Sequence, residues 1–150
     1  MGKLQYEIVI DAPREKVWEN IVNDEPYRKW VAPFMPGSYF EGSWEKGARM
    51  RFVVKGENGE VNGMFSEIAE CRKPEFISIE HLGLVKNGKE DRESEEAKKW
   101  VSDHENYTLT DLGGRTRFRV DMDNVPVEME KDFADSWPRA LALLKELSEK

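Results

Sequence analysis

The chain has 150 residues, of which 39% are hydrophobic and 35% are charged, and its formal net charge is -7. This length is sufficient for one buried core, so the sequence predicts a single domain over residues 1–150. The acidic balance excludes a broad phosphate-binding surface, which needs clustered lysine and arginine, and we expect no nucleic-acid partner.

The first third of the chain predicts one strand and two short helices. Residues 3–11 alternate in polarity and include β-branched residues, which is typical of a strand. Pro13 fits the first turn of a helix, where its missing N–H is not needed. That helix breaks over residues 23–26, a second short helix follows over 27–31, and prolines and a glycine indicate a loop over 32–38.

The middle of the chain predicts a run of antiparallel strands joined by turns. Residues 56–59 and the pair Gly113 and Gly114 favour tight hairpins. A bulge or bend is expected near Gly63, where the apolar alternation is less regular. Residues 84–99 are polar, and Ser94 is expected to cap a short helix there. The predicted strands cover residues 48–55, 60–72, 76–83, 101–112 and 115–123.

A long amphipathic helix is predicted at the end of the chain. Pro138 lies inside it and lacks the N–H that would bond to the carbonyl of Ala134. A kink is therefore expected at Pro138, at a cost of about 3 kcal/mol unless packing compensates. The apolar stripe of this helix consists of Met129, Phe133, Trp137, Leu141 and Leu144.

The cellular location is predicted from the cysteine content and the opening residues. Cys71 is the single cysteine and has no partner for an internal disulfide, which is typical of a reducing compartment. The opening MGKLQYEIVIDAP contains no uninterrupted apolar run, so neither a signal peptide nor a membrane span is expected. We expect a cytoplasmic monomer without a membrane partner.

A run of strands followed by a helix predicts an α+β fold. Four segments have a distinctive order and spacing: IDAPREKVWENI, EHLGLVKNGKED, ENYTLTDLGGRTRFRVDMD and FADSWPRALALLKELSE. Together they resemble the START/Bet v 1-like superfamily, also called SRPBCC or helix-grip proteins. Within it they are most similar to small bacterial members named after the activator of heat-shock protein 90 ATPase. The resemblance implies a curved antiparallel sheet of about six or seven strands wrapped around the C-terminal helix, with two short helices after the first strand.

The resemblance also implies a cavity between the sheet and the long helix. Five tryptophans stand out in the sequence, and apolar walls with few polar groups are typical of small-molecule pockets. Trp100 is a candidate lid residue, and the expected kink would turn the ring of Trp137 toward the cavity. Glu67 is a further candidate polar contact. The expected ligand-binding residues are Trp30, Phe34, Met35, Phe52, Val54, Phe65, Ile77, Ile79, His81, Trp100, Tyr107, Phe118, Val120, Phe133, Trp137 and Leu141.

No metal or cofactor is expected. His81, His104 and Cys71 lack the spacing of metal ligands, and no phosphate-binding or dinucleotide glycine motif is present. His81 shares a strand face with Ile77 and Ile79, and Tyr107 is expected across the sheet from it. A histidine and a tyrosine in an apolar pocket are weak candidates for general acid–base catalysis.

Three functions therefore stay open. The leading interpretation is the binding of a small hydrophobic or aromatic ligand, such as a lipid or polyketide, without a catalytic role. The resemblance implies two alternatives. One is a co-chaperone-like module that binds a chaperone through its acidic surface, and the other is a polyketide cyclase-like enzyme that uses His81 and Tyr107.

Overall fold

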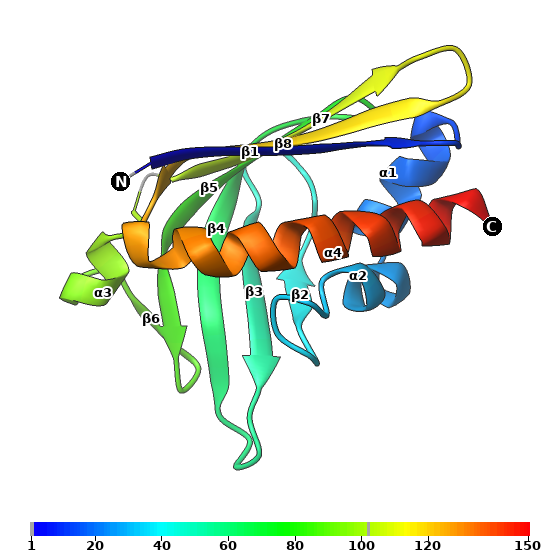
Figure 1. Ribbon diagram of the computed structural model, residues 1–150. Helices are drawn as coiled ribbons and strands as arrows, with labels where there is room; N and C mark the ends of the chain where they lie inside the picture. The colour runs from blue at the N-terminus through cyan, green and yellow to red at the C-terminus, as the bar shows by residue number, and fades with distance from the viewer. Residues whose placement is uncertain (1, 102) are drawn as a thin grey trace.

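The structure is a computed structural model that describes residues 2–101 and 103–150. An antiparallel sheet of eight strands curves around a long C-terminal helix (Figure 1). The strand order is β1-β8-β7-β5-β4-β3-β2, and β6 pairs with β5 outside this path. The strands are β1 (Gly2–Ile10), β2 (Tyr39–Gly42), β3 (Arg49–Lys55), β4 (Val61–Arg72), β5 (Phe76–Lys86), β6 (Lys89–Asp91), β7 (His104–Asp111) and β8 (Thr116–Val125). The helices are α1 (Arg14–Val22), α2 (Asp24–Trp30), α3 (Glu95–Lys98), the 3-10 turn η1 (Val127–Met129) and α4 (Glu130–Glu149).

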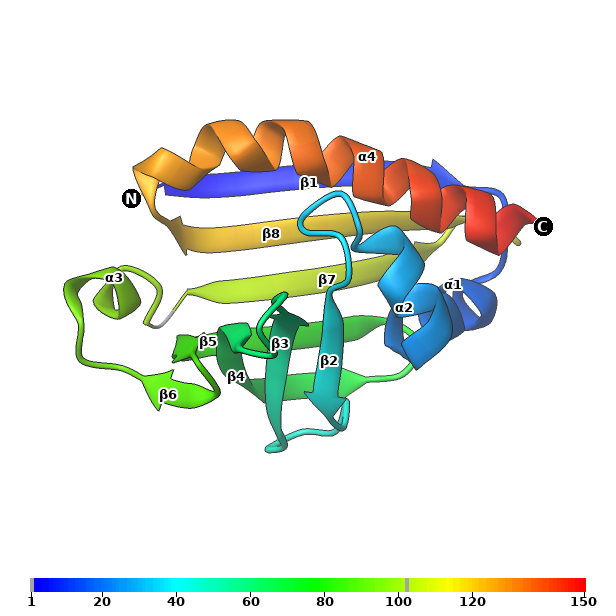
Figure 2. The same ribbon diagram turned by 90° about the horizontal axis from the view of Figure 1, so that it is seen from below.

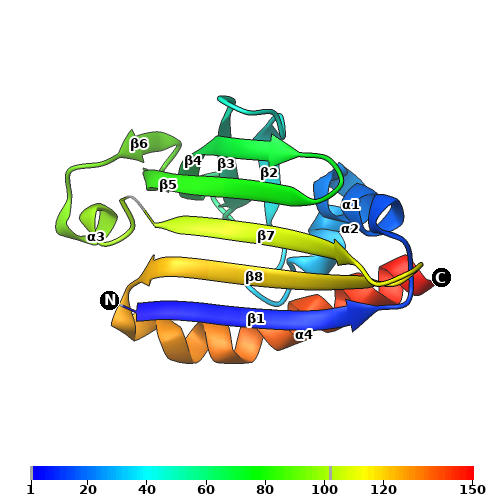
Figure 3. The same ribbon diagram turned by 90° about the horizontal axis from the view of Figure 1, so that it is seen from above.

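The predicted α+β helix-grip fold is confirmed. Seen from below, α4 crosses one face of the sheet beside β1 and β8, while α1 and α2 close one end and α3 lies at the other (Figure 2). Seen from above, β1, β8, β7 and β5 run side by side, and α4 lies along the β1 edge of the sheet (Figure 3). The main core fills the space between this curved face and the helices.

Two strands were missed by the sequence prediction, which gave six or seven. The strand β2 has four residues after a proline- and glycine-rich loop, too few for an alternating pattern to be visible. The strand β6 has three residues with the charged sequence KED, and its pairing with β5 rather than its own pattern defines it. That pairing also extends β5 to Lys86, beyond the predicted end at residue 83.

Some predicted boundaries shift for local reasons. The helix α2 begins at Asp24 instead of residue 27, because Pro26 lies in its first turn and needs no N–H there. The strand predicted over 101–112 begins at His104, and Ser102 lies outside the described residues. Ser94 caps α3 as predicted, and its hydroxyl accepts a hydrogen bond from the Ala97 N–H at 3.1 Å.

The expected irregularity in β4 lies slightly further along the chain than predicted. Gly63 pairs in register with Val53, and the register shifts fall between Phe65 and Ser66 and again after Ile68. Gly63 is needed for a different reason. A Cβ placed at Gly63 would lie 2.1 Å from the carbonyl oxygen of Phe52, so the two strands approach too closely for any other residue.

The helix α4 continues through Pro138 without a break. Its axis curves gently along its length in Figure 2. The stripe predicted for this helix is buried at Trp137, Leu141 and Leu144. This stripe packs against the concave face of the sheet.

Candidate functional site

A cavity of about 190 Å³ lies between the sheet and the helices. Its walls come from α2 and the loop after it, from the strands β3, β4, β5 and β7, from the segment after α3 and from the first half of α4. Most of the surrounding side chains are aromatic. The residues that line it are Tyr27, Trp30, Val31, Phe34, Ser38, Phe52, Met64, Ile79, His81, Trp100, Glu105, Tyr107, Phe133 and Trp137.

Trp137 is the central aromatic residue of this wall. Its ring centroid lies 4.8 Å from that of Phe34 and 6.3 Å from those of Trp30 and Tyr107. On the side of the sheet edge it stacks on Tyr6 at 6.4 Å. The side chain is only 2% exposed, so contacts from three elements hold the ring in one position. Trp137 is one of the residues that line the cavity.

Trp100 approaches the cavity from the opposite end. Trp100 follows the short helix α3, which Ser94 caps at its N-terminus. The ring of Trp100 lies edge-on to His81 at 6.4 Å and to Phe133 at 6.1 Å. Trp100 therefore closes the end of the cavity that α1 and α2 do not reach.

The wall residues His81, Glu105 and Tyr107 belong to a chain of hydrogen-bonded side chains on β4, β5 and β7. Ser66 Oγ lies 2.8 Å from His81 Nδ1, and His81 Nε2 lies 3.3 Å from Glu105 Oε1. The Tyr107 hydroxyl donates to the other carboxylate oxygen of Glu105. Neighbouring strands bring these groups together, since Glu105 and Tyr107 are two residues apart on one face of β7.

Carboxylates dominate the electrostatics around His81. Burial alone would lower the pKa of His81, but the hydrogen bond to Glu105 and the charges of Glu105, Asp103 and Asp123 outweigh it and raise the pKa. Burial, together with the charge and hydrogen bond of Glu105, raises the pKa of Tyr107 well above its usual value. Tyr107 is therefore a neutral hydrogen-bond donor to Glu105.

Asp103 lies beneath this network and is fully buried. Its Oδ1 accepts the Asn124 N–H at 2.8 Å, and its backbone carbonyl accepts the His81 N–H at 2.9 Å. Within residues 2–101 and 103–150, its Oδ2 has no hydrogen-bond partner. Burial raises the pKa of Asp103 to about 6, although His81 and the Asn124 N–H act in the opposite direction.

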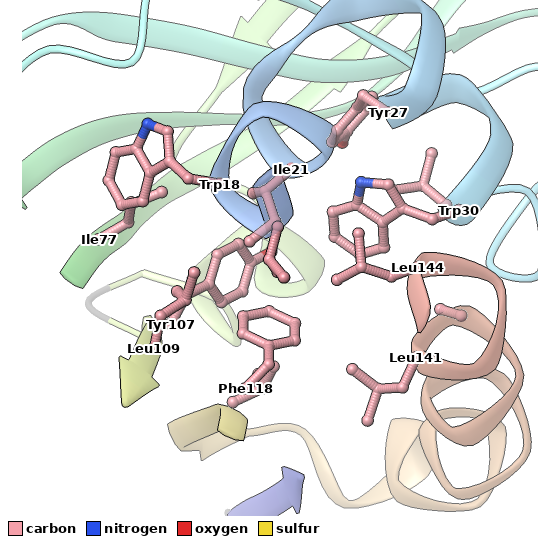
Figure 4. Close-up of a cluster of buried hydrophobic side chains, with 14 of the residues drawn as sticks. Trp18, Ile21, Tyr27, Trp30, Ile77, Tyr107, Leu109, Phe118, Leu141 and Leu144 are labelled. Carbon is pink, nitrogen blue, oxygen red and sulfur yellow. The ribbon is translucent and has the colours of Figure 1, made fainter. Parts of the chain in front are cut away.

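The predicted site residues divide between the cavity wall and the surrounding structure. Those in the wall are Trp30, Phe34, Phe52, Ile79, His81, Trp100, Tyr107, Phe133 and Trp137. Four others belong to the solid core instead, where Figure 4 shows several of them packed with Leu144 and Ile21: Ile77, Phe118, Val120 and Leu141. Phe118, for example, packs edge-on against Tyr107 at 5.4 Å and contacts the protein rather than the cavity.

Three more predicted residues lie away from the cavity. Met35 is 53% exposed, because the turn after α2 points Phe34 inward and Met35 outward. Val54 lies outside the wall near Gly37 of the same loop. Phe65 follows Met64 on β4 and therefore points to the other face of the sheet, into a small cluster with Val53, Leu82 and Val85.

The sequence prediction missed five wall residues: Tyr27, Val31, Ser38, Met64 and Glu105. The aromatic character of Tyr27 was a usable signal, because it precedes Trp30 by three positions on the same helix face. Glu105 was not among the expected site residues, while Glu67 was named as the polar contact. Glu67 instead pairs with Arg49 at 3.2 Å and does not line the cavity.

Among residues 2–101 and 103–150, no group of three or more histidine, cysteine or acidic side chains could hold a metal ion. In the same residues, no helix is long and apolar enough to cross a membrane. A second hollow of about 230 Å³ is lined mainly by charged side chains, among them Arg49, Arg51 and Glu90.

The sequence and the fold were compared with known proteins. Residues 11–149 match the sequence model of the family described as Activator of Hsp90 ATPase homolog 1-like protein. A comparison with curated proteins gave no match.

Similar solved structures share the fold at low sequence identity. Protein CV1439 from Chromobacterium violaceum has a TM-score of 0.71 and 17% identity, with 100% of this chain and 99% of that chain covered. The Aha1 dimer from Colwellia psychrerythraea has a TM-score of 0.69 and 16% identity, with 99% and 97% covered. A protein from Staphylococcus epidermidis has a TM-score of 0.72 and 14% identity, with 98% and 89% covered.

Proposed function

Because the chain belongs to the Activator of Hsp90 ATPase homolog 1-like family, we propose that it binds a small aromatic ligand in the cavity between α4 and the sheet. The observation that carries this proposal is the aromatic wall. Rings from α2, β3, β7 and α4 surround the space, and the ionisable groups His81, Glu105 and Tyr107 lie on its β5 and β7 side. Apolar walls with a few fixed polar groups are the usual composition of a small-molecule site.

The volume of the cavity limits the size of this ligand. An apolar cavity of about 150 Å³ accommodates benzene, whereas pockets for drug-sized ligands measure about 300–1,000 Å³. The cavity of about 190 Å³ therefore suits a molecule of one ring, or two small fused rings. A long-chain lipid or a multi-ring polyketide would require the loop after α2 to move.

The indole N–H signals in a nitrogen-15 NMR spectrum test this proposal directly. Trp30, Trp100 and Trp137 line the cavity, whereas Trp18 packs over Ile77 at the other end of the core (Figure 4). Titration with benzyl alcohol or indole is expected to shift the N–H signals of the three wall indoles in a saturable manner and to leave the Trp18 signal unchanged. Palmitate serves as the long-chain comparison and is expected to bind more weakly.

Two matched variants separate the cavity from the surface. Ser38 lines the cavity and donates to the Met35 carbonyl, while Ser43 is an exposed loop residue that contacts Glu45. Ser38→Trp is expected to fill the cavity and abolish the shifts, and Ser43→Trp is expected to leave them unchanged. Saturable binding that survives Ser38→Trp, or no saturable shift with any probe, would contradict the proposal.

A chaperone-binding role is a second candidate, and the family match supports it. The formal net charge of -7 is complementary to a basic patch on a partner protein. The test is a pull-down with a purified bacterial Hsp90, followed by its ATPase rate with and without this protein. We expect stimulation that weakens with salt, and neither binding nor stimulation would remove this candidate.

The contact between His81, Glu105 and Tyr107 supports a third candidate, general acid–base catalysis on a bound carbonyl compound. Glu105 or His81 would remove a proton from the carbon beside the carbonyl, and the Tyr107 hydroxyl would hydrogen-bond the oxygen. Exchange of the methyl protons of acetophenone for deuterium in D₂O measures this step. Equal rates for the wild type, His81→Ala and Glu105→Gln, with acetophenone bound to all three, would exclude it.

A further inference from the structure

The charges of the cavity wall restrict which aromatic ligand it accepts. No lysine or arginine occurs among the described residues of the wall, whose ionisable groups are His81, Glu105 and two tyrosines. Resting on the ligand-binding function proposed above, we propose that the cavity selects small aromatic amines. The protonated amine would lie against the Glu105 carboxylate and the ring among the indoles.

Glu105 has unused capacity to accept hydrogen bonds. One of its oxygens lies 3.3 Å from His81 Nε2, and the other accepts from the Tyr107 hydroxyl. A carboxylate has about four acceptor positions, so about two are left for a ligand. The Tyr107 hydroxyl uses its O–H to donate a hydrogen bond to Glu105, so the lone pairs of its oxygen are left to accept from a ligand. This side of the cavity therefore offers acceptors to a ligand that carries N–H donors.

The aromatic wall adds to the same preference. The faces of aromatic rings carry partial negative charge and attract cations within about 6 Å. Trp30, Phe133 and Trp137 surround the space that faces Glu105. An anionic ligand would find no lysine or arginine among the described wall residues, and an uncharged ligand would gain no charge attraction to Glu105.

His81 does not cancel this negative charge. Its imidazole is faced by Glu105 on β7, by Asp103 before β7, by Asp123 on β8 and by the neutral Ser66 and Trp100. Three carboxylates thus surround one histidine, with His104 beside Asp123 at 3.4 Å. Even a protonated His81 leaves excess negative charge, and a bound ammonium would compete with the imidazolium for Glu105.

Three probes of similar shape test the proposal at about pH 7.5. These are benzylamine, which is protonated, benzyl alcohol, which is neutral, and benzoate, which is negative. Titration calorimetry or the wall indole shifts would give the affinities. We expect benzylamine to bind at least about tenfold more tightly than benzyl alcohol, which corresponds to about 1.4 kcal/mol, and benzoate to bind weakest.

The variant Glu105→Gln keeps the shape of the side chain and removes its charge. It is expected to bring the affinities of benzylamine and benzyl alcohol within about twofold of each other. The control Glu67→Gln changes a carboxylate that pairs with Arg49 outside the cavity, and it should keep the full preference.

The outcomes separate this inference from the function on which it rests. If none of the three probes binds, the proposed ligand-binding function fails as well. If benzyl alcohol or benzoate binds as tightly as benzylamine to the wild type, only the selection of amines is wrong. A preference that persists in a folded Glu105→Gln protein also overturns it. Should Glu105→Gln fail to fold, the ranking in the wild type alone decides.

Discussion

The buried carboxyl of Asp103 gives the sharpest prediction about stability. Burial raises its pKa from 3.8 to about 6. The folded protein therefore holds this proton at pH values where the unfolded chain has released it. Stability from this group is fully present below about pH 4 and is lost as the pH rises through about 6. The shift of about 2 units corresponds to about 3 kcal/mol at about 1.4 kcal/mol per unit.

Asp103→Asn removes this dependence. The asparagine oxygen can still accept the Asn124 N–H, so the hydrogen bond at 2.8 Å is retained. Relative to the wild type, the variant is expected to gain about 3 kcal/mol between about pH 4 and about pH 7. The carboxylate of Asp103 also helps to raise the pKa of His81, whose stabilising effect fades as the pH rises. Both effects therefore make the stability of the variant rise relative to that of the wild type as the pH increases.

Urea unfolding followed by tryptophan fluorescence at several pH values measures the difference between the two proteins. Asp91→Asn is a control of opposite sign. The Asp91 pKa is lowered by its hydrogen bonds with Ser94 and Glu93, so its stabilisation is present at neutral pH and is lost in acid. Asp91→Asn should therefore lose stability relative to the wild type as the pH rises. A pH-independent difference for Asp103→Asn would refute the reasoning.

Three other substitutions probe the fold by the same unfolding assay. Trp137→Ala removes a side chain that is 2% exposed and is expected to cost about 3–5 kcal/mol; a loss below about 1 kcal/mol would contradict its packing role. Gly63→Ala is expected to cost far more than Gly59→Ala, since a Cβ at Gly63 would meet the Phe52 oxygen and one at Gly59 meets nothing within 4 Å. Pro138→Ala restores the N–H that faces the Ala134 carbonyl and is expected to stabilise α4 by up to about 3 kcal/mol; a destabilised variant would show that the bend is required for packing.

The fold could be predicted from the sequence because its main elements have clear local signals. The alternation in β1, the hairpin at Gly113 and Gly114 and the apolar stripe of α4 each depend on near neighbours in the chain. The strands β2 and β6 could not be predicted in this way. Their residues are extended because of partners on β3 and β5, and a three- or four-residue segment has no periodicity of its own.

The cavity wall could be predicted only in part. Phe52, Ile79 and Tyr107 follow from strand alternation, since they point to the concave face. Alternation cannot separate a residue that borders empty space from one that fills the core, so Phe118 and Leu141 were placed in the wall. Phe65 was misplaced because the register of β4 shifts beside it. Glu105 becomes a site residue only when β5 and β7 bring it to His81.

The most direct test of the proposed function is a set of intermolecular NOEs in the complex of this protein with benzyl alcohol. The aromatic wall predicts contacts from the ring protons of benzyl alcohol to the indoles of Trp30, Trp100 and Trp137 and to the ring of Phe34. Contacts confined to the charged hollow around Arg49 and Glu90, or to the exposed Met35, would contradict it.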